Sequence, residues 1–165
     1  MFTVEQYIKT LKECLNDSSD ILIQNIKEIL SFQYYNEIEL LDFEVSSQPF
    51  ELSIRMFSMD REANEIFYEG PDEAIFAGSH QLIEDIEYYN LPEDKLDDFW
   101  EFYEQNDESI SRAEKLTIVE WFIGCWDQAN GESVPLPAYL TFHDDIESYD
   151  LFNKKWINAE EKWAN

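Results

Sequence analysis

The chain has 165 residues and a mass of 19.7 kDa, which is the size of one domain with a buried core. It carries 37 acidic against 11 basic residues, for a net charge of −26, yet 44% hydrophobic and 16% aromatic residues argue against disorder. This charge disfavours nucleic acid and anionic membranes as direct partners, because phosphate binding depends on lysine and arginine. We therefore predict a single acidic domain over residues 1–165.

The first thirty residues have the pattern of two amphipathic helices. Thr3 is a suitable N-cap for the first, and Asp20 near the start of the second suits the helix dipole. The second helix is predicted from Ser19 to Phe32. The apolar stripes consist of Val4, Tyr7, Ile8, Leu11, Cys14 and Leu15, and of Leu22, Ile26, Ile29 and Leu30.

Strands are predicted next, because apolar and polar residues begin to alternate. The predicted strands cover residues 41–45, 50–56 and 65–69, with a turn over residues 46–49 that ends at a proline. Short connections between them favour an antiparallel meander with one buried face.

Helical patterns return after Gly70-Pro71. We predict a helical turn over 72–76 and a short helix over 79–89 with Leu82, Ile83 and Ile86 facing inward. A further helix is predicted from Pro92 to about Gln105, followed by a break at residues 107–109.

The stretch 109–145 has the strongest apolar pattern of the chain. Two apolar stripes predict a helix buried on more than one side, and Asn130-Gly131 is suited to end it. A strand is predicted over 136–142, residues 146–156 fit either a strand or a helix, and the tail fits a helical turn. The fold class that follows is α+β, with a small antiparallel β-sheet (the meander plus a late strand) packed against several helices.

The chain shows no targeting or membrane signal. Its first residues lack a basic segment followed by an apolar one, and no apolar run reaches the length of a membrane helix. Cys14 and Cys125 lack the spacing of a metal or redox motif, so we expect buried thiols in a reducing compartment. These features predict a cytoplasmic protein.

The acidic residues are concentrated in the middle of the chain. Residues 62–111 contain sixteen acidic residues and one basic residue, Lys95. Steering toward a basic protein partner explains such a charge, as do solubility or a high-salt cytoplasm. The expected docking residues are Glu84, Asp85, Glu87, Asp94, Asp97, Asp98, Glu101 and Glu104. Trp100 and Tyr103 are expected in the core, although either would be a natural anchor at the rim of such a surface.

Catalytic motifs are absent from the sequence. His143-Asp144-Asp145 is the cluster most suited to metal or hydrolytic chemistry, but adjacent strand residues point to opposite faces and no second histidine is near in sequence. The four glycines form no phosphate-binding loop. We expect no enzyme activity, no cofactor and no metal, with a metal-dependent hydrolase using His143 as the least favoured alternative.

Two segments carry a resemblance to a known group of proteins: SIRMFSMDREANEIF and WFIGCWDQANGESVPLPAYLTFHDDIESYDL. Together with the acidity, aromatic content and length, they resemble the small acidic immunity proteins of bacterial polymorphic-toxin systems. These families span unrelated folds and share no functional motif, so the resemblance assigns no site residue. It implies a cytoplasmic inhibitor that binds a basic, often nuclease-like, toxin domain.

A second hypothesis is that the acidic surface imitates nucleic acid and occupies a DNA-binding protein. Carboxylates on one helical stripe advance about 5–6 Å per step, whereas duplex phosphates advance about 3.4 Å per strand. A mimic would therefore need two or more stripes combined. The two hypotheses differ in the partner: a cognate toxin, or a resident DNA-binding protein.

Overall fold

The computed structural model describes residues 1–48, 51–88, 90–143 and 145–164. The helices in this part of the chain are α1 (Val4–Asp17), α2 (Ser19–Leu30) and α3 (Leu96–Gln128), with short 3-10 helices η1 (Glu93–Lys95), η2 (Gly131–Ser133) and η3 (Ala159–Trp163). The strands are β1 (Gln33–Tyr34), β2 (Leu40–Gln48), β3 (Glu51–Met59), β4 (Ile75–Phe76), β5 (Ser79–Glu87), β6 (Ala138–Phe142), β7 (Glu147–Asp150) and β8 (Lys155–Asn158).

Six of these strands form one sheet in the order β5-β3-β2-β6-β7-β8, and β1 pairs with β4 in a separate two-stranded sheet. Within the large sheet β2 and β6 run parallel, and every other neighbouring pair is antiparallel. The predicted α+β class is confirmed. The parallel pair makes the sheet mixed, because the chain passes through β3, β5 and α3 before it returns beside β2.

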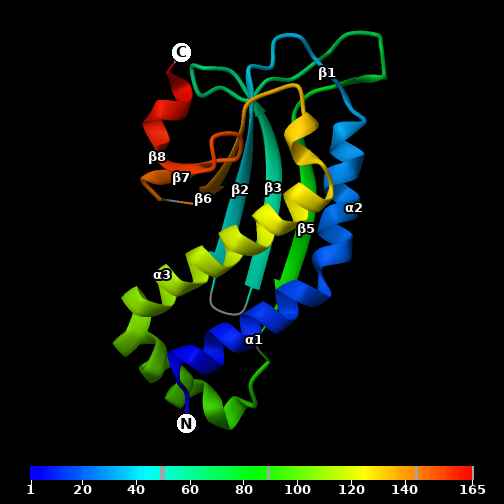
Figure 1. The fold of residues 1–165 in the computed structure, drawn as a ribbon. Coiled ribbons are helices and arrows are strands. Elements are labelled where there is room, and N and C mark those ends of the chain that lie inside the picture. The colour runs from blue at the N-terminus through cyan, green and yellow to red at the C-terminus, as the bar shows by residue number, and fades with distance from the viewer. Residues whose placement is uncertain (49–50, 89, 144, 165) are drawn as a thin grey trace.

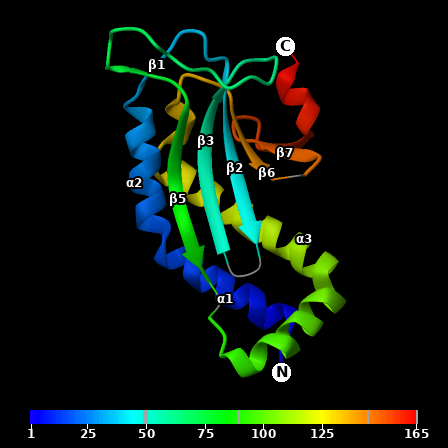
Figure 2. The ribbon, with the colours of Figure 1, turned by 180° about the vertical axis from the view of Figure 1, so that it is seen from behind.

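The helices α1, α2 and α3 cover one face of the sheet, as Figure 1 shows. Phe43 of β2 points to this face, where its ring lies 5.6 Å from that of Phe122 and 5.5 Å from that of Trp126. On the other face no helix crosses β5, β3 and β2 within the described residues (Figure 2). The short helix η3 docks on that side, where Lys162 donates a hydrogen bond to Asp42 of β2.

The two N-terminal helices and the central hairpin confirm the sequence pattern. Thr3 caps α1, with its Oγ1 accepting a hydrogen bond of 3.1 Å from the amide of Gln6. The strands of the hairpin, β2 and β3, pair in full register from Leu40↔Met59 to Gln48↔Glu51. The turn predicted over 46–49 is wrong for residues 46–48, which belong to β2, and Pro49 and the strand start at Phe50 lie outside the described residues.

The predicted third strand over 65–69 is wrong. Beyond one bridge between Met59 and Glu65, this segment is part of a loop, and β5 takes the place beside β3. The segment 72–76 is also not a helical turn: a turn at Asp72 leads into β4. A few apolar residues in a short segment do not distinguish a strand, a helical turn and a loop, because strand formation depends on whether the edge of another strand is free to pair.

The predicted helix over 79–89 is the strand β5, and its last predicted residue, Tyr89, lies outside the described residues. Register shifts between β3 and β5 interrupt the two-residue alternation, so that Leu82 and Ile83 are both buried although they are adjacent. Together with Ile86 they imitate the i, i+1, i+4 spacing of a helix. Asp85, with φ +28°, marks the same irregularity.

The helices predicted over 92–105 and from 109 onward are the two parts of α3. A kink separates them at Asn106, whose φ of −126° and ψ of 16° are not helical, one residue before the predicted break at 107–109. The Asn106 side chain donates a 2.8 Å hydrogen bond to the carbonyl of Phe102, which is typical of a local distortion. The predicted end is confirmed, since Asn130 adopts a left-handed conformation with φ +61°. Burial on several sides is incomplete, because Leu116 is 49% exposed.

The ambiguous segment 146–156 contributes β7 and the start of β8, which pair as an antiparallel hairpin. The tail forms the short helix η3, in agreement with the predicted helical turn. Cys14 is half-buried and Cys125 buried, and both are free thiols. Burial is the main factor that raises the pKa of each thiol.

Candidate docking surface

The eight predicted docking residues lie at one end of the molecule, where β5 ends and α3 begins (Figures 1 and 2). We call these eight residues the acidic end. Three of them belong to β5, one to η1 and four to α3, and all eight side chains are exposed. They are Glu84, Asp85 and Glu87; Asp94; and Asp97, Asp98, Glu101 and Glu104.

The charge of the acidic end is not compensated by ion pairs in the part of the chain that the structure describes. Among the described residues, no lysine, arginine or histidine nitrogen forms an ion pair with a carboxylate of the acidic end, within a limit of 4.0 Å. Some lysines elsewhere do form ion pairs, as Lys115 does with Asp145 at 2.7 Å. The polar contacts to the acidic end come from neutral groups, such as Ser53, whose Oγ donates to Asp85 at 3.0 Å. The field of these carboxylates therefore extends into solvent.

The helix dipole explains part of this arrangement. Asp97 and Asp98 lie in the first turn of α3, where negative charge is stabilising. Glu101 and Glu104 lie beyond that turn, where the effect fades. Local helix stability accordingly accounts for the first-turn acids and leaves the two glutamates unexplained.

Trp100 is not a core residue as predicted, because 41% of it is exposed. Its neighbour Phe99 is fully buried instead, and Tyr103 is half-buried. At helical spacing Trp100 lies beside Asp97 and Glu104, three residues before and four after it. An aromatic side chain thus borders the acidic end. The apolar periodicity predicted the helix correctly, but it could not rank the burial of Phe99, Trp100 and Tyr103, which lie close together on it.

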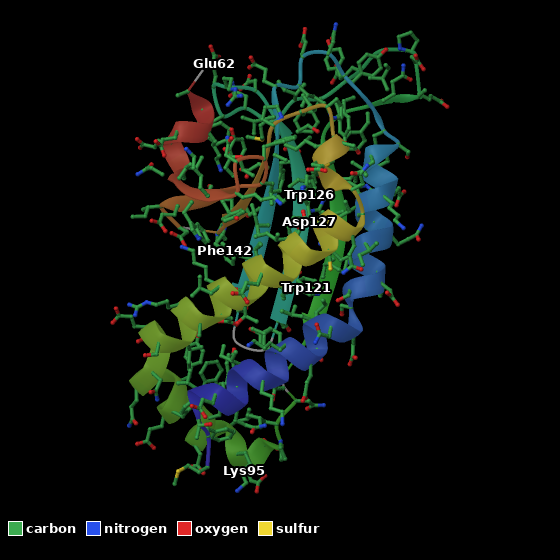
Figure 3. The ribbon with its side chains drawn as sticks, viewed as in Figure 1. Glu62, Lys95, Trp121, Trp126, Asp127 and Phe142 are labelled. Atoms are coloured by element: carbon green, nitrogen blue, oxygen red, sulfur yellow. The ribbon has the colours of Figure 1, made fainter. Side chains whose placement is uncertain are left out.

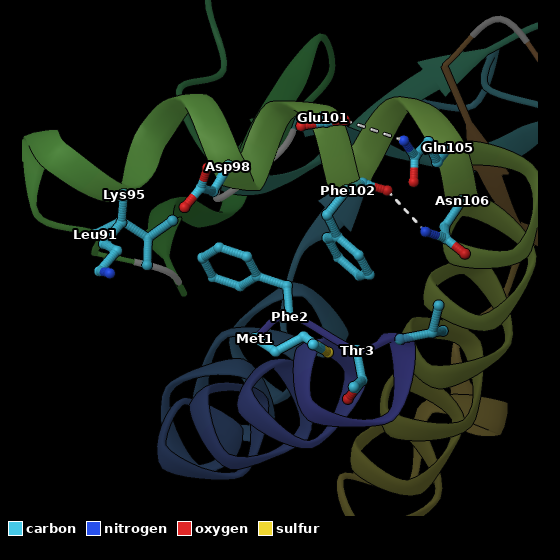
Figure 4. Close-up of a pocket in the computed structure, with 11 residues that line it drawn as sticks. Met1, Phe2, Thr3, Leu91, Lys95, Asp98, Glu101, Phe102, Gln105 and Asn106 are labelled. Atoms are coloured by element: carbon cyan, nitrogen blue, oxygen red, sulfur yellow. Dashed lines mark hydrogen bonds between the residues drawn. The ribbon is translucent and has the colours of Figure 1, made fainter.

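A pocket of about 880 Å³ adjoins the acidic end, between the start of α1 and the first turns of α3 (Figure 4). Its lining includes the acidic residues Asp98 and Glu101, the basic residue Lys95 and the apolar residues Phe2, Leu91 and Phe102. Sequence reasoning missed it, because its walls come from segments about ninety residues apart. Only Phe2 had a signal in the sequence. An apolar residue directly before the N-cap often packs against the first turns of the helix that follows, here α1.

His143 lies at the end of β6, exposed, with its Nδ1 3.1 Å from Oε1 of Glu44. Asp145 is paired with Lys115, and Asp144 lies outside the described residues. Within the described ranges, no three histidine, cysteine or acidic side chains form a group able to hold a metal ion. The two described members of the predicted cluster, His143 and Asp145, thus have different partners in Glu44 and Lys115.

Glu114 is a buried carboxyl group that the sequence analysis did not single out. It is 6% exposed, and its Oε1 accepts hydrogen bonds from Tyr7, at 3.3 Å, and from Tyr88. Burial raises the pKa of Glu114, and the two tyrosine hydrogen bonds only partly oppose this effect. The cluster joins α1, the end of β5 and α3, and so holds together the elements that carry the acidic end.

Comparisons with known proteins give no match: no family model, no curated protein and no solved structure is similar to this chain. In the described part of the chain, no helix has the combination of length and apolar character that crossing a membrane requires.

Proposed function

We propose that this protein is a non-enzymatic inhibitor that binds a basic protein partner through its acidic end. The observation that carries the proposal is the set of eight exposed carboxylates that form no ion pair among the described residues. The resemblance noted in the sequence gives the partner's class: a cognate, nuclease-like bacterial toxin, met in the cytoplasm by an immunity protein.

The physical argument begins with the cost of the charge. Like charges at one end of a domain destabilise it, and a partner rich in lysine and arginine would relieve that repulsion on binding. Opposite charges also raise association rates toward about 10⁸–10⁹ M⁻¹s⁻¹ at low salt, a useful property against a lethal partner. Trp100 would supply the aromatic contact that such interfaces use for affinity.

The test compares two variants of equal net charge. One neutralises the acidic end outside the pocket (Glu84→Gln, Asp94→Asn, Asp97→Asn, Glu104→Gln), and the matched control neutralises four exposed acids elsewhere (Glu13→Gln, Glu62→Gln, Glu120→Gln, Glu132→Gln). Figure 3 shows that one control position, Glu62, lies at the opposite end of the molecule from Lys95.

Each protein is immobilised and exposed to lysate of the native host at low salt, and bound proteins are eluted with rising salt. We expect wild type and control to retain one basic protein whose nuclease activity they inhibit at one-to-one stoichiometry, and the acidic-end variant to release it at lower salt. Equal retention by both variants would refute the acidic end as the docking surface. Recovery of many DNA-binding proteins would instead favour nucleic-acid mimicry.

A further inference from the structure

The pocket beside the acidic end has an aromatic wall. Phe2, just before α1, stacks on Phe102 of α3 with ring centroids 5.8 Å apart and an interplanar angle of 30°. Phe2 also lies perpendicular to Phe99, with ring centroids 5.3 Å apart. Figure 4 shows the two phenylalanine rings between the ribbons of α1 and α3. The wall is thus a fixed apolar surface at the junction of the two helices.

The rim of the pocket carries two carboxylates, those of Asp98 and Glu101, and one amine, that of Lys95. Asp98 and Glu101 are three residues apart on α3, so they lie on the same side of the helix. Neither forms an ion pair within the described residues, and Glu101 accepts only a long hydrogen bond of 3.4 Å from Gln105. Two carboxylates beside an aromatic wall form a site for a group that is cationic at its tip and apolar along its stem.

Asn106 closes the pocket at the bend of α3. Its side chain bonds the carbonyl of Phe102, the residue that forms half of the aromatic wall. The bend and the wall are therefore coupled through one hydrogen bond, which is drawn in Figure 4. This gives the irregular residue in an otherwise long helix a role in shaping the site.

We propose that this pocket receives an arginine side chain from the basic partner, with the aliphatic stem against Phe2 and Phe102 and the guanidinium at Asp98 and Glu101. That the arginine comes from the basic partner rests on the proposed function. Arginine fits better than lysine, because its planar guanidinium stacks on aromatic rings and can donate two parallel hydrogen bonds to one carboxylate. A volume of about 880 Å³ also leaves room for the residues that flank the arginine in a loop.

The test uses a small probe rather than the partner. The ¹⁵N-labelled protein is titrated with the blocked tripeptide acetyl-Ala-Arg-Ala-amide and, in parallel, with the versions that carry lysine or uncharged citrulline in place of arginine. We expect the arginine peptide to shift the amide signals of Leu91, Glu101, Phe102 and Gln105, with weaker shifts from lysine and none from citrulline.

Two double variants separate the pocket from the general charge. Asp98→Asn with Glu101→Gln should weaken arginine-peptide binding by about tenfold, whereas Asp97→Asn with Glu104→Gln, on the same helix outside the pocket, should change it less than about twofold. All four positions are exposed, so the fold is expected to persist. Phe102→Leu keeps an apolar wall without the aromatic ring and should also weaken binding.

Equal losses in the two double variants, or signal shifts spread over all the acidic residues, would overturn the proposal. The result is independent of the capture experiment. Localised peptide binding without a captured partner would support the pocket and refute the proposed function. A captured partner that binds the Asp98→Asn, Glu101→Gln variant as tightly as wild type would support the proposed function and refute the pocket as the arginine site.

Discussion

Replacement of Lys162 should reveal how much stability one buried ion pair contributes. Lys162 is 3% exposed and lies in η3, over the sheet face that the three helices leave open. Its Nζ is 2.9 Å from Oδ2 of Asp42, and it also donates to Thr141 at 2.9 Å and to Ser148 at 3.3 Å. The variant Lys162→Met keeps most of the volume and removes the charge.

The expected loss follows from what remains around Asp42. Breaking a buried pair by removing one partner typically costs about 3–5 kcal/mol, because the other charge stays buried. Asp42 keeps one donor, the Thr141 hydroxyl at 2.6 Å, so we expect the lower value, about 3 kcal/mol. With an m-value of about 2 kcal/mol/M, the urea midpoint should fall by about 1.5 M.

Urea unfolding is followed by far-UV circular dichroism rather than tryptophan fluorescence, because Lys162 Nζ lies 4.8 Å from the ring centroid of Trp163. The control is Lys155→Met, an exposed lysine, which should change the stability by less than about 0.5 kcal/mol. The double variant Asp42→Leu with Lys162→Met should recover most of the loss, because no unpaired charge remains. A loss below about 1 kcal/mol in Lys162→Met, or a double variant less stable than it, would refute this reasoning.

Three further outcomes are expected. Folding raises the pKa of Glu114 above its ordinary value of 4.5, so the wild-type protein should lose stability as pH rises from 4.5 to the raised pKa. Glu114→Gln should lack this loss. If the difference in urea midpoint between wild type and Glu114→Gln is the same at pH 4 and at pH 8, the prediction is contradicted. Burial raises the pKa of both thiols, so a thiol reagent at pH 7.5 should label Cys125 more slowly than half-buried Cys14, and both rapidly in urea. Sodium chloride raised from 20 to 300 mM should increase the melting temperature by screening self-repulsion; an unchanged value would mean that the charges are well dispersed.

Local patterns were sufficient for the elements whose residues interact mainly with their chain neighbours. The stripe and cap at Thr3 predicted α1, the alternation predicted the strands of the β2–β3 hairpin, and Asn130 marked the end of α3. In each case the same residues determine both the backbone conformation and the face that is buried. The net charge and its concentration around the start of α3 were likewise readable, because charge is a property of composition.

Contacts between distant segments decided the rest. Ser79–Glu87 is a strand because the edge of β3 was available to it, and its bulge gave a helical spacing of apolar residues. Trp100 is exposed because Phe99 occupies the space beside Tyr7 and Phe2.

The pocket behind Asp98 and Glu101 exists only where residues 1–4 meet residues 91–106. The sequence by itself therefore determined that the protein is acidic, α+β and rich in buried aromatic residues. Only the tertiary structure decided which carboxylates stand beside an aromatic wall, because that depends on the docking of α1 against α3 and not on the spacing of residues within either helix.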